Sequence, residues 1–133
     1  MENGTPTYVR DGKKFEGGFL GGDIEEAVEG SPKAEEYAHE FKSGVTTGFA
    51  VTMLGIVGIL GGAVVTGVEA SSQANQPGPG TVPVTGLVVM GAGLVLDLVG
   101  LGVELNAIPH FYDAINAYND DLRPGAETPA AGR

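Results

Sequence analysis

The 133-residue chain contains no cysteine and no tryptophan. Without cysteine it can form no disulfide, thiolate metal site, cysteine nucleophile, or thiol-linked haem or lipid. Basic residues are also scarce, with 7 Lys and Arg against 17 Asp and Glu, which gives a formal net charge of −10. Because binding to a phosphate backbone needs clustered Lys and Arg, we expect no nucleic-acid partner.

Charged residues are almost absent from the middle of the chain. Between residues 44 and 105 there are three acidic residues and no Lys or Arg. Residues 43–68 carry no charge at all, and a helix of that length spans about 39 Å, more than the roughly 30 Å hydrocarbon core of a bilayer. A second apolar stretch covers residues 82–105. The two stretches predict two transmembrane helices.

The connection between the two stretches, residues 69–81, reads EASSQANQPGPGT, and its Pro and Gly residues end helices. We therefore expect an all-α membrane protein, a two-span transmembrane helical hairpin with spans at 44–68 and 82–105. A buried hairpin of a soluble protein is disfavoured because the first stretch is rich in glycine, which costs roughly 1 kcal/mol per residue in a water-exposed helix. β-structure is disfavoured because polar and apolar residues do not alternate.

Segments of mixed polarity flank the hairpin. Residues 1–43 predict an Asp-Gly turn between short β-prone pieces, followed by amphipathic helices with Asp23 and Ser31 as N-caps. Residues 106–122 predict an amphipathic helix with Pro109 in its first turn, and residues 123–133 a disordered tail. Aromatic residues in both flanks predict a layer at one membrane interface: Tyr37, Phe41, Phe111, Tyr112 and Tyr118.

The distribution of basic residues predicts the topology. All seven Lys and Arg lie outside the hairpin, and its connection has none. By the positive-inside rule, both termini face the cytoplasm of a bacterial inner (cytoplasmic) membrane and the connection faces the periplasm. The first 40 residues contain no apolar core of the signal-peptide kind, so we expect the first span to serve as its own insertion signal.

Glycines recur in both spans at the intervals that allow close helix packing. The candidate packing residues are Gly44, Gly48, Gly55, Gly58, Gly62, Gly86, Gly93 and Gly100. These glycines can serve contacts within the hairpin or contacts between subunits. We expect both, and hence a homo-oligomer or a subunit of a larger membrane complex.

Two carboxylates, Asp97 and Glu104, share one face of the second span with its glycines. Folding the hairpin back on itself places Asp97 near the depth of Thr52, and Glu104 near Thr46 and Thr47. Because ionisable groups within a membrane are costly and often functional, two interpretations arise. The carboxyls either hydrogen-bond across the helix interface or form an ion or proton site.

Signals for catalysis are weak. His39 and His110 flank the two spans at the same predicted interface, where a bis-histidine haem or metal site is the alternative to ordinary interfacial histidines. The sequence has no phosphate-binding glycine loop, no Ser-His-Asp grouping and no zinc-ligand spacing. We expect no enzyme activity, no cofactor and no metal.

Four short motifs occur in order along the chain: Tyr8, the Gly-Lys-Lys turn at 12–14, the P-x-A-x-x-Y run at 32–37, and the A-I-x-x-Y-N run at 114–119. With the glycine-rich hairpin between them, the chain resembles a group of small uncharacterised bacterial two-helix membrane proteins. The resemblance implies the same architecture and no particular reaction.

The sequence therefore predicts a non-enzymatic structural or assembly subunit in contact with membrane lipid. One alternative is an oligomeric channel or ion-coupled ring lined by Asp97 and Glu104, comparable in plan to the rotor-ring subunit of rotary ATP synthases. The alternating-glycine first helix and the basic loop of that subunit are absent here, so only a physical analogy holds. A second alternative is an accessory subunit of a respiratory or photosynthetic complex.

Overall fold

The computed structural model describes residues 7–10, 12–18, 20–74 and 82–123. Its elements in chain order are β1 (Thr7–Arg10), β2 (Lys13–Glu16), α1 (Ile24–Ala27), α2 (Pro32–Ala74) and α3 (Val84–Asp121). The chain divides into two compact units. We call residues 46–105 the hairpin unit, and residues 1–45 together with 106–133 the terminal unit.

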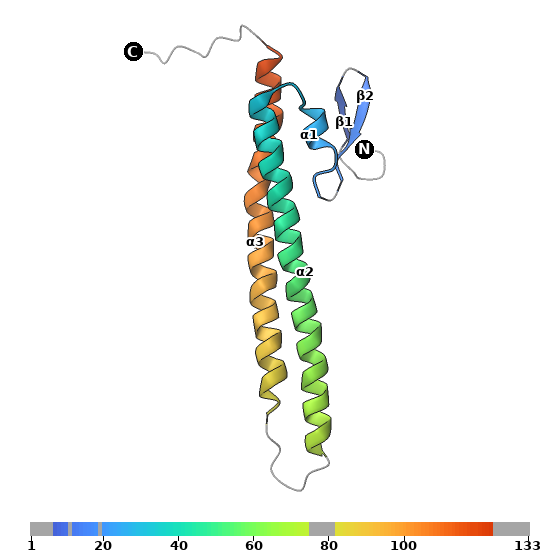
Figure 1. The fold of residues 1–133 in the computed structure, drawn as a ribbon, viewed down its shortest axis with the longest axis vertical. Helices are drawn as coiled ribbons and strands as arrows, with labels where there is room; N and C mark the ends of the chain where they lie inside the picture. Colours follow the sequence, from blue (N-terminus) through green and yellow to red (C-terminus); the bar gives the residue numbers. More distant parts are fainter. Residues whose placement is uncertain (1–6, 11, 19, 75–81, 124–133) are drawn as a thin grey trace, which may run out of the picture. The chain divides into compact units, whose positions relative to one another are not determined.

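The expected helical hairpin is confirmed. The long helices α2 and α3 run antiparallel, and each is long and apolar enough to cross a membrane (Figure 1). Helix α2 continues to Ala74, beyond the predicted end of the span at residue 68. The hydroxyls of Ser71 and Ser72 donate to the carbonyls one turn earlier, at 2.8 and 2.9 Å, so these polar residues are accommodated within the helix. Residues 75–81 of the predicted connection lie outside the described residues.

Residues 106–121 are helical, but no helix begins near Pro109, because α3 runs without a break through it. A proline inside a helix removes one backbone hydrogen bond and costs roughly 3 kcal/mol. The neighbouring turns are held by packing, since Ala107 is 3% exposed and Ala114 is fully buried. Burial on both sides of Pro109 offsets the missing hydrogen bond. Of the predicted tail, residues 124–133 lie outside the described part of the chain.

The terminal unit has a small core. Ile24, Val28, Ala34, Ala38 and Ala114 are buried together, and larger side chains such as Tyr37 and Phe111 pack against them. Three of the five are alanines from α2 and α3, and small side chains let helix backbones approach closely. Ser31 is also buried, at 1% exposure, and its hydroxyl donates to the carboxylate of Asp121 at the end of α3.

The N-terminal segment folds as the Asp-Gly turn predicts. Strands β1 and β2 pair antiparallel with Arg10 opposite Lys13, and Gly12 adopts the left-handed φ of 79° that such a turn requires. The N-cap prediction is right for Ser31, whose Oγ accepts from the Ala34 amide at 3.4 Å. Asp23 also occupies the predicted N-cap position of α1, but its side chain makes no capping hydrogen bond, and its Oδ2 accepts from the Glu16 amide at 3.3 Å.

Candidate functional site: the seam between α2 and α3

Six facing pairs of residues form the contact between α2 and α3 in the hairpin unit, which we call the seam. The pairs are Gly48 with Glu104, Thr52 with Gly100, Gly55 with Asp97, Ile59 with Gly93, Gly62 with Met90, and Thr66 with Gly86. Positions on both helices advance by alternating steps of four and three, the spacing of coiled-coil packing. Each pair joins one glycine to one larger residue, and the glycine alternates between the two helices.

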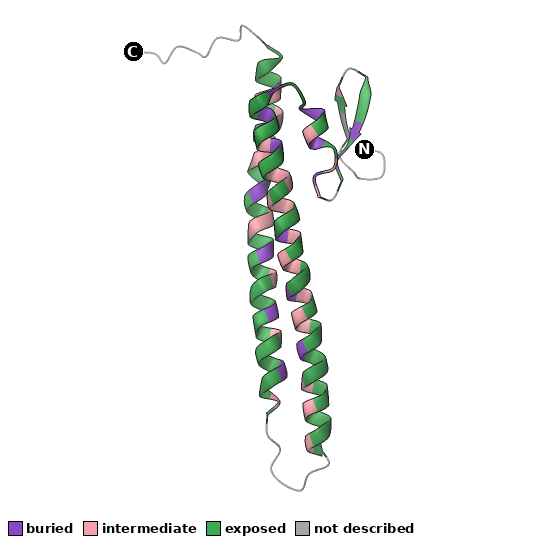
Figure 2. Ribbon diagram, in the orientation of Figure 1, coloured by how far each residue is buried: buried purple, intermediate pink, exposed green. Residues whose placement is uncertain are grey.

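The glycines allow direct contact between the two backbones. A Cβ on Gly55 would lie 2.5 Å from the amide nitrogen of Asp97, and a Cβ on Gly93 would lie 2.6 Å from the carbonyl oxygen of Gly55. Real Cβ atoms essentially never approach another heavy atom within 3.0 Å. Any side chain at these positions would therefore push the helices apart. In Figure 2 the buried residues of both helices recur along the sides that face each other, and the remaining surface is mostly exposed.

The structure places all eight candidate packing glycines at contacts within the chain. Besides the seam glycines, a Cβ on Gly58 would lie 3.0 Å from the Cα of Gly93. In the terminal unit, a Cβ on Gly44 would lie 2.6 Å from the Cβ of Ala107. Four other glycines of α2 and α3 meet nothing within 4 Å, namely Gly61, Gly67, Gly91 and Gly102. A contact between subunits would therefore use other residues than the eight candidates.

Most of the larger seam residues are polar. The Thr52 hydroxyl donates to Glu104 Oε1 at 3.4 Å, and the Thr66 hydroxyl donates to the carbonyl of Gly62 at 2.8 Å. Beyond Thr66, the Glu69 carboxylate accepts from the amide of Gly86 at 3.5 Å. That amide belongs to the first turn of α3, where backbone donors lack helical partners and carboxylates are favoured. The hairpin thus carries polar contacts on its inner face.

The predicted pairing of carboxyls with threonines differs from the structure. Glu104 bonds Thr52, whereas Thr46 and Thr47 are exposed. Asp97 lies opposite Gly55, nearly one helical turn from the expected level of Thr52. The reason is the register of the seam, in which each glycine faces a larger residue, so that Gly55 faces Asp97. Asp97 is half-buried, and no hydrogen bond joins its carboxyl to any described residue.

The five predicted interface aromatics lie in the terminal unit. The rings of Phe41 and Phe111 are 5.2 Å apart between centroids, and Phe111 meets Tyr112 edge-on at 5.3 Å. Tyr37 stacks on His110, and the Arg10 guanidinium lies 5.3 Å from the centroid of Tyr118. Tyr112 is 60% exposed, while the other four are half-buried. The rings of Tyr37 and Phe41 therefore contact α3, Tyr118 contacts Arg10 of β1, and Tyr112 faces outward.

The two histidines pair with different carboxylates. His39 Nδ1 lies 3.2 Å from Glu25, and His110 Nδ1 lies 3.2 Å from Glu40. Glu25 also accepts from Lys42 Nζ at 2.8 Å, and the hydrogen bonds from Lys42 and then His39 hold the pKa of Glu25 below its ordinary value. Among the described residues, no three His, Asp or Glu side chains form a group that could hold a metal ion. The described residues therefore provide no group of ligands that supports the alternative of a bis-histidine haem or metal site.

No protein-family model, no curated protein and no solved structure matches this chain. The resemblance to two-helix bacterial membrane proteins stays a prediction based on the four motifs. Evidence on function comes from the contacts and exposure of the chain's own residues.

Proposed function

We propose that the protein is a non-enzymatic integral membrane protein whose α2–α3 hairpin crosses the bilayer. In this proposal it serves as a structural or assembly subunit of a homo-oligomer or a larger membrane complex. One observation carries the proposal: the hairpin unit has inverted polarity. Its seam holds glycines, two threonines and two carboxylates, while its outer surface is dominated by Val and Leu.

Exposure of the outer surface favours lipid as its environment. In the most apolar 18-residue window of each long helix, only 17% of the residues are buried. The core helix of a soluble protein is mostly buried, whereas here apolar side chains such as Val57, Val64 and Val95 are 60–67% exposed. Contact of so large an apolar surface with water is unfavourable, and contact with hydrocarbon removes that cost.

Two features support assembly with another chain. The eight candidate glycines make contacts within the chain. Gly61 and Gly91 instead lie on the outer surface with no atom within 4 Å of an added Cβ, which leaves room for close contact with another helix. The Asp97 carboxyl has no hydrogen-bond partner among the described residues, and an unsatisfied carboxyl is costly in a membrane. A helix of a neighbouring subunit could pack at Gly61 and Gly91, and the same subunit could supply a hydrogen-bond donor to the Asp97 carboxyl.

The same carboxyl keeps an ion-coupled role as a second candidate. Asp97 has no basic residue in its span, as expected of a group that binds a proton or a cation. Both Asp97 and Glu104 lie opposite glycines of α2, so a ring lined by them would need these side chains to reach past the seam. Proton or cation flux in liposomes that is lost in Asp97→Asn would favour the ion role. No flux from a verified oligomer would favour assembly.

The proposed topology has both termini in the cytoplasm, with the bacterial inner membrane as the location. It rests on the absence of Lys and Arg from residues 43–105, against all seven in the flanks. Lys13, Lys14, Lys33 and Lys42 all lie in the terminal unit, which would then be a cytoplasmic layer of the protein.

Purification of a tagged chain from native membranes, followed by mass spectrometry and crosslinking, tests the proposed function. A homo-oligomer predicts crosslinked multiples of this chain alone. A role as accessory subunit of a respiratory or photosynthetic complex predicts stoichiometric, unrelated large partners. Recovery of an uncrosslinked single chain, or recovery in the water-soluble fraction, would contradict the proposal.

A further inference from the structure

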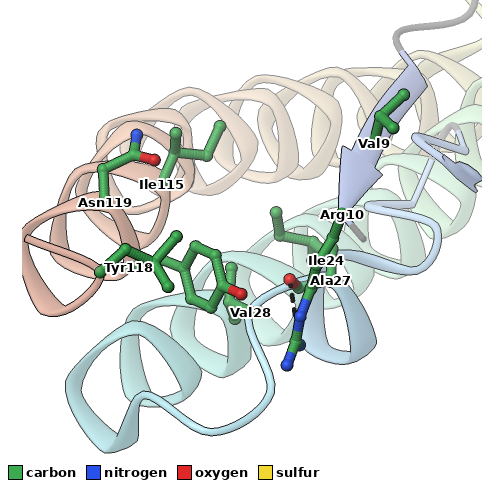
Figure 3. Close-up of a pocket in the computed structure, with 9 residues that line it drawn as sticks. Val9, Arg10, Ile24, Ala27, Val28, Ile115, Tyr118 and Asn119 are labelled. Atoms are coloured by element: carbon green, nitrogen blue, oxygen red, sulfur yellow. Dashed lines mark hydrogen bonds between the residues drawn. The ribbon is translucent and has the colours of Figure 1, made fainter. Parts of the chain in front are cut away.

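The terminal unit contains a cavity of about 490 Å³ that lies outside the seam and plays no part in the proposed function. Its walls come from β1, from α1 and the residue after it, and from the last turns of α3 (Figure 3). The lining residues are Val9, Arg10, Ile24, Ala27, Val28, Ile115, Tyr118, Asn119 and Leu122. The volume falls within the range of roughly 300–1,000 Å³ typical of small-molecule sites.

The described lining is aliphatic, with a few polar groups. Val9 and Leu122 are 67% and 62% exposed, so apolar surface is open to solvent at the cavity. Apolar walls with a small number of placed polar groups are typical of sites for apolar ligands. The polar groups are the Arg10 guanidinium, the Tyr118 hydroxyl and the Asn119 amide. No carboxylate is among the described lining residues, although the chain as a whole carries a net charge of −10.

The Arg10 guanidinium is held in place beside the cavity. Its Nη1 donates to the carbonyl oxygens of Glu26 and Ala27 at 3.4 and 3.5 Å, and its Cζ lies 5.3 Å from the centroid of the Tyr118 ring. Figure 3 shows the bond to the Ala27 carbonyl and the Tyr118 ring nearby. A positive charge fixed at the edge of an aliphatic cavity complements a ligand with an apolar chain and an anionic end.

We propose that this cavity binds a long-chain fatty acid, with the acyl chain along Val9, Ile115 and Leu122 and the carboxylate beside Arg10. The carboxylate interacts with the positively charged guanidinium of Arg10. The acyl chain covers apolar side chains that would otherwise contact water. The neutral alcohol of the same chain length would keep the apolar contact and lose the charge interaction. Stronger binding of the fatty acid than of the alcohol is therefore the result that identifies this site.

The test uses the full chain in nanodiscs of zwitterionic phosphatidylcholine and measures binding of oleate and of oleyl alcohol. We expect oleate to bind at one per chain and oleyl alcohol to bind at least about tenfold more weakly. A photoactivatable fatty acid should label the segment 113–123, and excess oleate should compete for that labelling. Ile115→Trp fills the cavity and should abolish both signals. Ile108→Trp, on the same helix but outside the lining, is the matched control and should preserve them.

Arg10→Gln should weaken oleate about tenfold and leave oleyl alcohol unchanged, and Arg10→Lys should recover part of the loss. Lys14→Gln removes an equal charge outside the lining and should change neither ligand. Equal binding of acid and alcohol would overturn the proposal, as would equal effects of the two tryptophan variants. Photolabelling confined to residues 46–105 would show simple partition into the bilayer and would also overturn it. None of these outcomes depends on the oligomeric state, so the site and the proposed function fail separately.

Discussion

The Cα of Gly55 lies so close to Asp97 that a Cβ added to Gly55 would come within 2.5 Å of the Asp97 amide nitrogen. A close backbone approach of the two helices and the Asp97 carboxyl therefore occupy one layer of the seam. A larger residue at Gly55 would disturb the packing of the two helices. A substitution at Asp97 would instead change the polar group that lies beside α2. The two residues allow the structural and chemical roles of the seam to be tested apart.

Gly55→Leu should destabilise the helix pair by roughly 2 kcal/mol or more, because backbone atoms of α3 fill the space its side chain needs. Gly61→Leu is the matched control, since a Cβ there meets nothing within 4 Å. It should stay within about 0.5 kcal/mol of the wild type in monomeric micelles. SDS titration checks both variants, with spin labels at Ala50→Cys and Leu101→Cys reporting helix separation. Equal sensitivity of the two variants would contradict the described seam.

The hydrogen bond between Thr52 and Glu104 should stabilise the hairpin by about 0.5–1.5 kcal/mol. Thr52→Val and Glu104→Met, which lacks an oxygen acceptor, form alone and together a double-mutant cycle that isolates the pair. Thr47→Val serves as the control because Thr47 is exposed on the same helix. The same SDS titration measures each variant. Strict additivity of Thr52→Val and Glu104→Met would show that the pair makes no contribution.

Acid should weaken the terminal unit through Glu25. Its pKa in the folded protein lies below the ordinary 4.5 because Lys42 and His39 donate to it. The stabilisation is complete above pH 4.5 and is lost as the pH falls through the lowered pKa. Glu25→Gln should therefore lower the melting temperature at pH 7 and have progressively less effect as the pH falls below 4.5.

The Glu25 effect should be small and salt-sensitive, since the side chain is 39% exposed. Glu29→Gln, an exposed glutamate in the same unit, removes an equal charge and should show no such dependence on pH. A pH-independent effect of Glu25→Gln would indicate that the pairing with Lys42 does not form.

Ser31→Ala should cost about 1–2 kcal/mol, because Ser31 is buried, caps α2 and donates to Asp121 near the end of α3. Loss of the hydroxyl leaves the Ala34 amide and the Asp121 carboxylate without these bonds. Ser43→Ala, at an exposed position inside α2, should be neutral. Thermal unfolding followed by near-ultraviolet circular dichroism compares the two. Similar melting temperatures for both variants would contradict the described cap.

The sequence predicts the helical hairpin well because the hydropathy of each span and the helix-breaking Pro and Gly residues between the spans are local features of the chain. The uncharged run 43–68, the apolar run 82–105 and the Pro-Gly connection suffice to indicate two long helices. The Asp-Gly turn predicts the β-hairpin for the same reason, since Gly12 provides the required positive φ. Ser31 as the cap of α2 is another local signal.

Register and helix ends depend on contacts between distant residues, which the sequence does not reveal directly. Folding the hairpin about its connection misplaces Asp97 by nearly a turn, because the contacts of glycines with larger residues across α2 and α3 set the register. Pro109 indicates a helix start, yet burial of Ala107 and Ala114 keeps α3 continuous through it. One signal for the register was present: larger residues at 90, 97 and 104 alternate with glycines at 86, 93 and 100. Matching glycine to side chain across the two helices gives the observed pairs.

Accessibility of single cysteines in the otherwise cysteine-free chain tests the membrane-spanning hairpin most directly. In spheroplasts of a bacterial host, a membrane-impermeant maleimide should label Ser72→Cys before lysis and Glu36→Cys only after lysis. Leu60→Cys, exposed in the middle of α2, should react with neither treatment until detergent is added. Labelling of Glu36→Cys with protection of Ser72→Cys would invert the topology. Labelling of Leu60→Cys by the impermeant reagent in lysed cells without detergent would contradict the membrane-spanning hairpin itself.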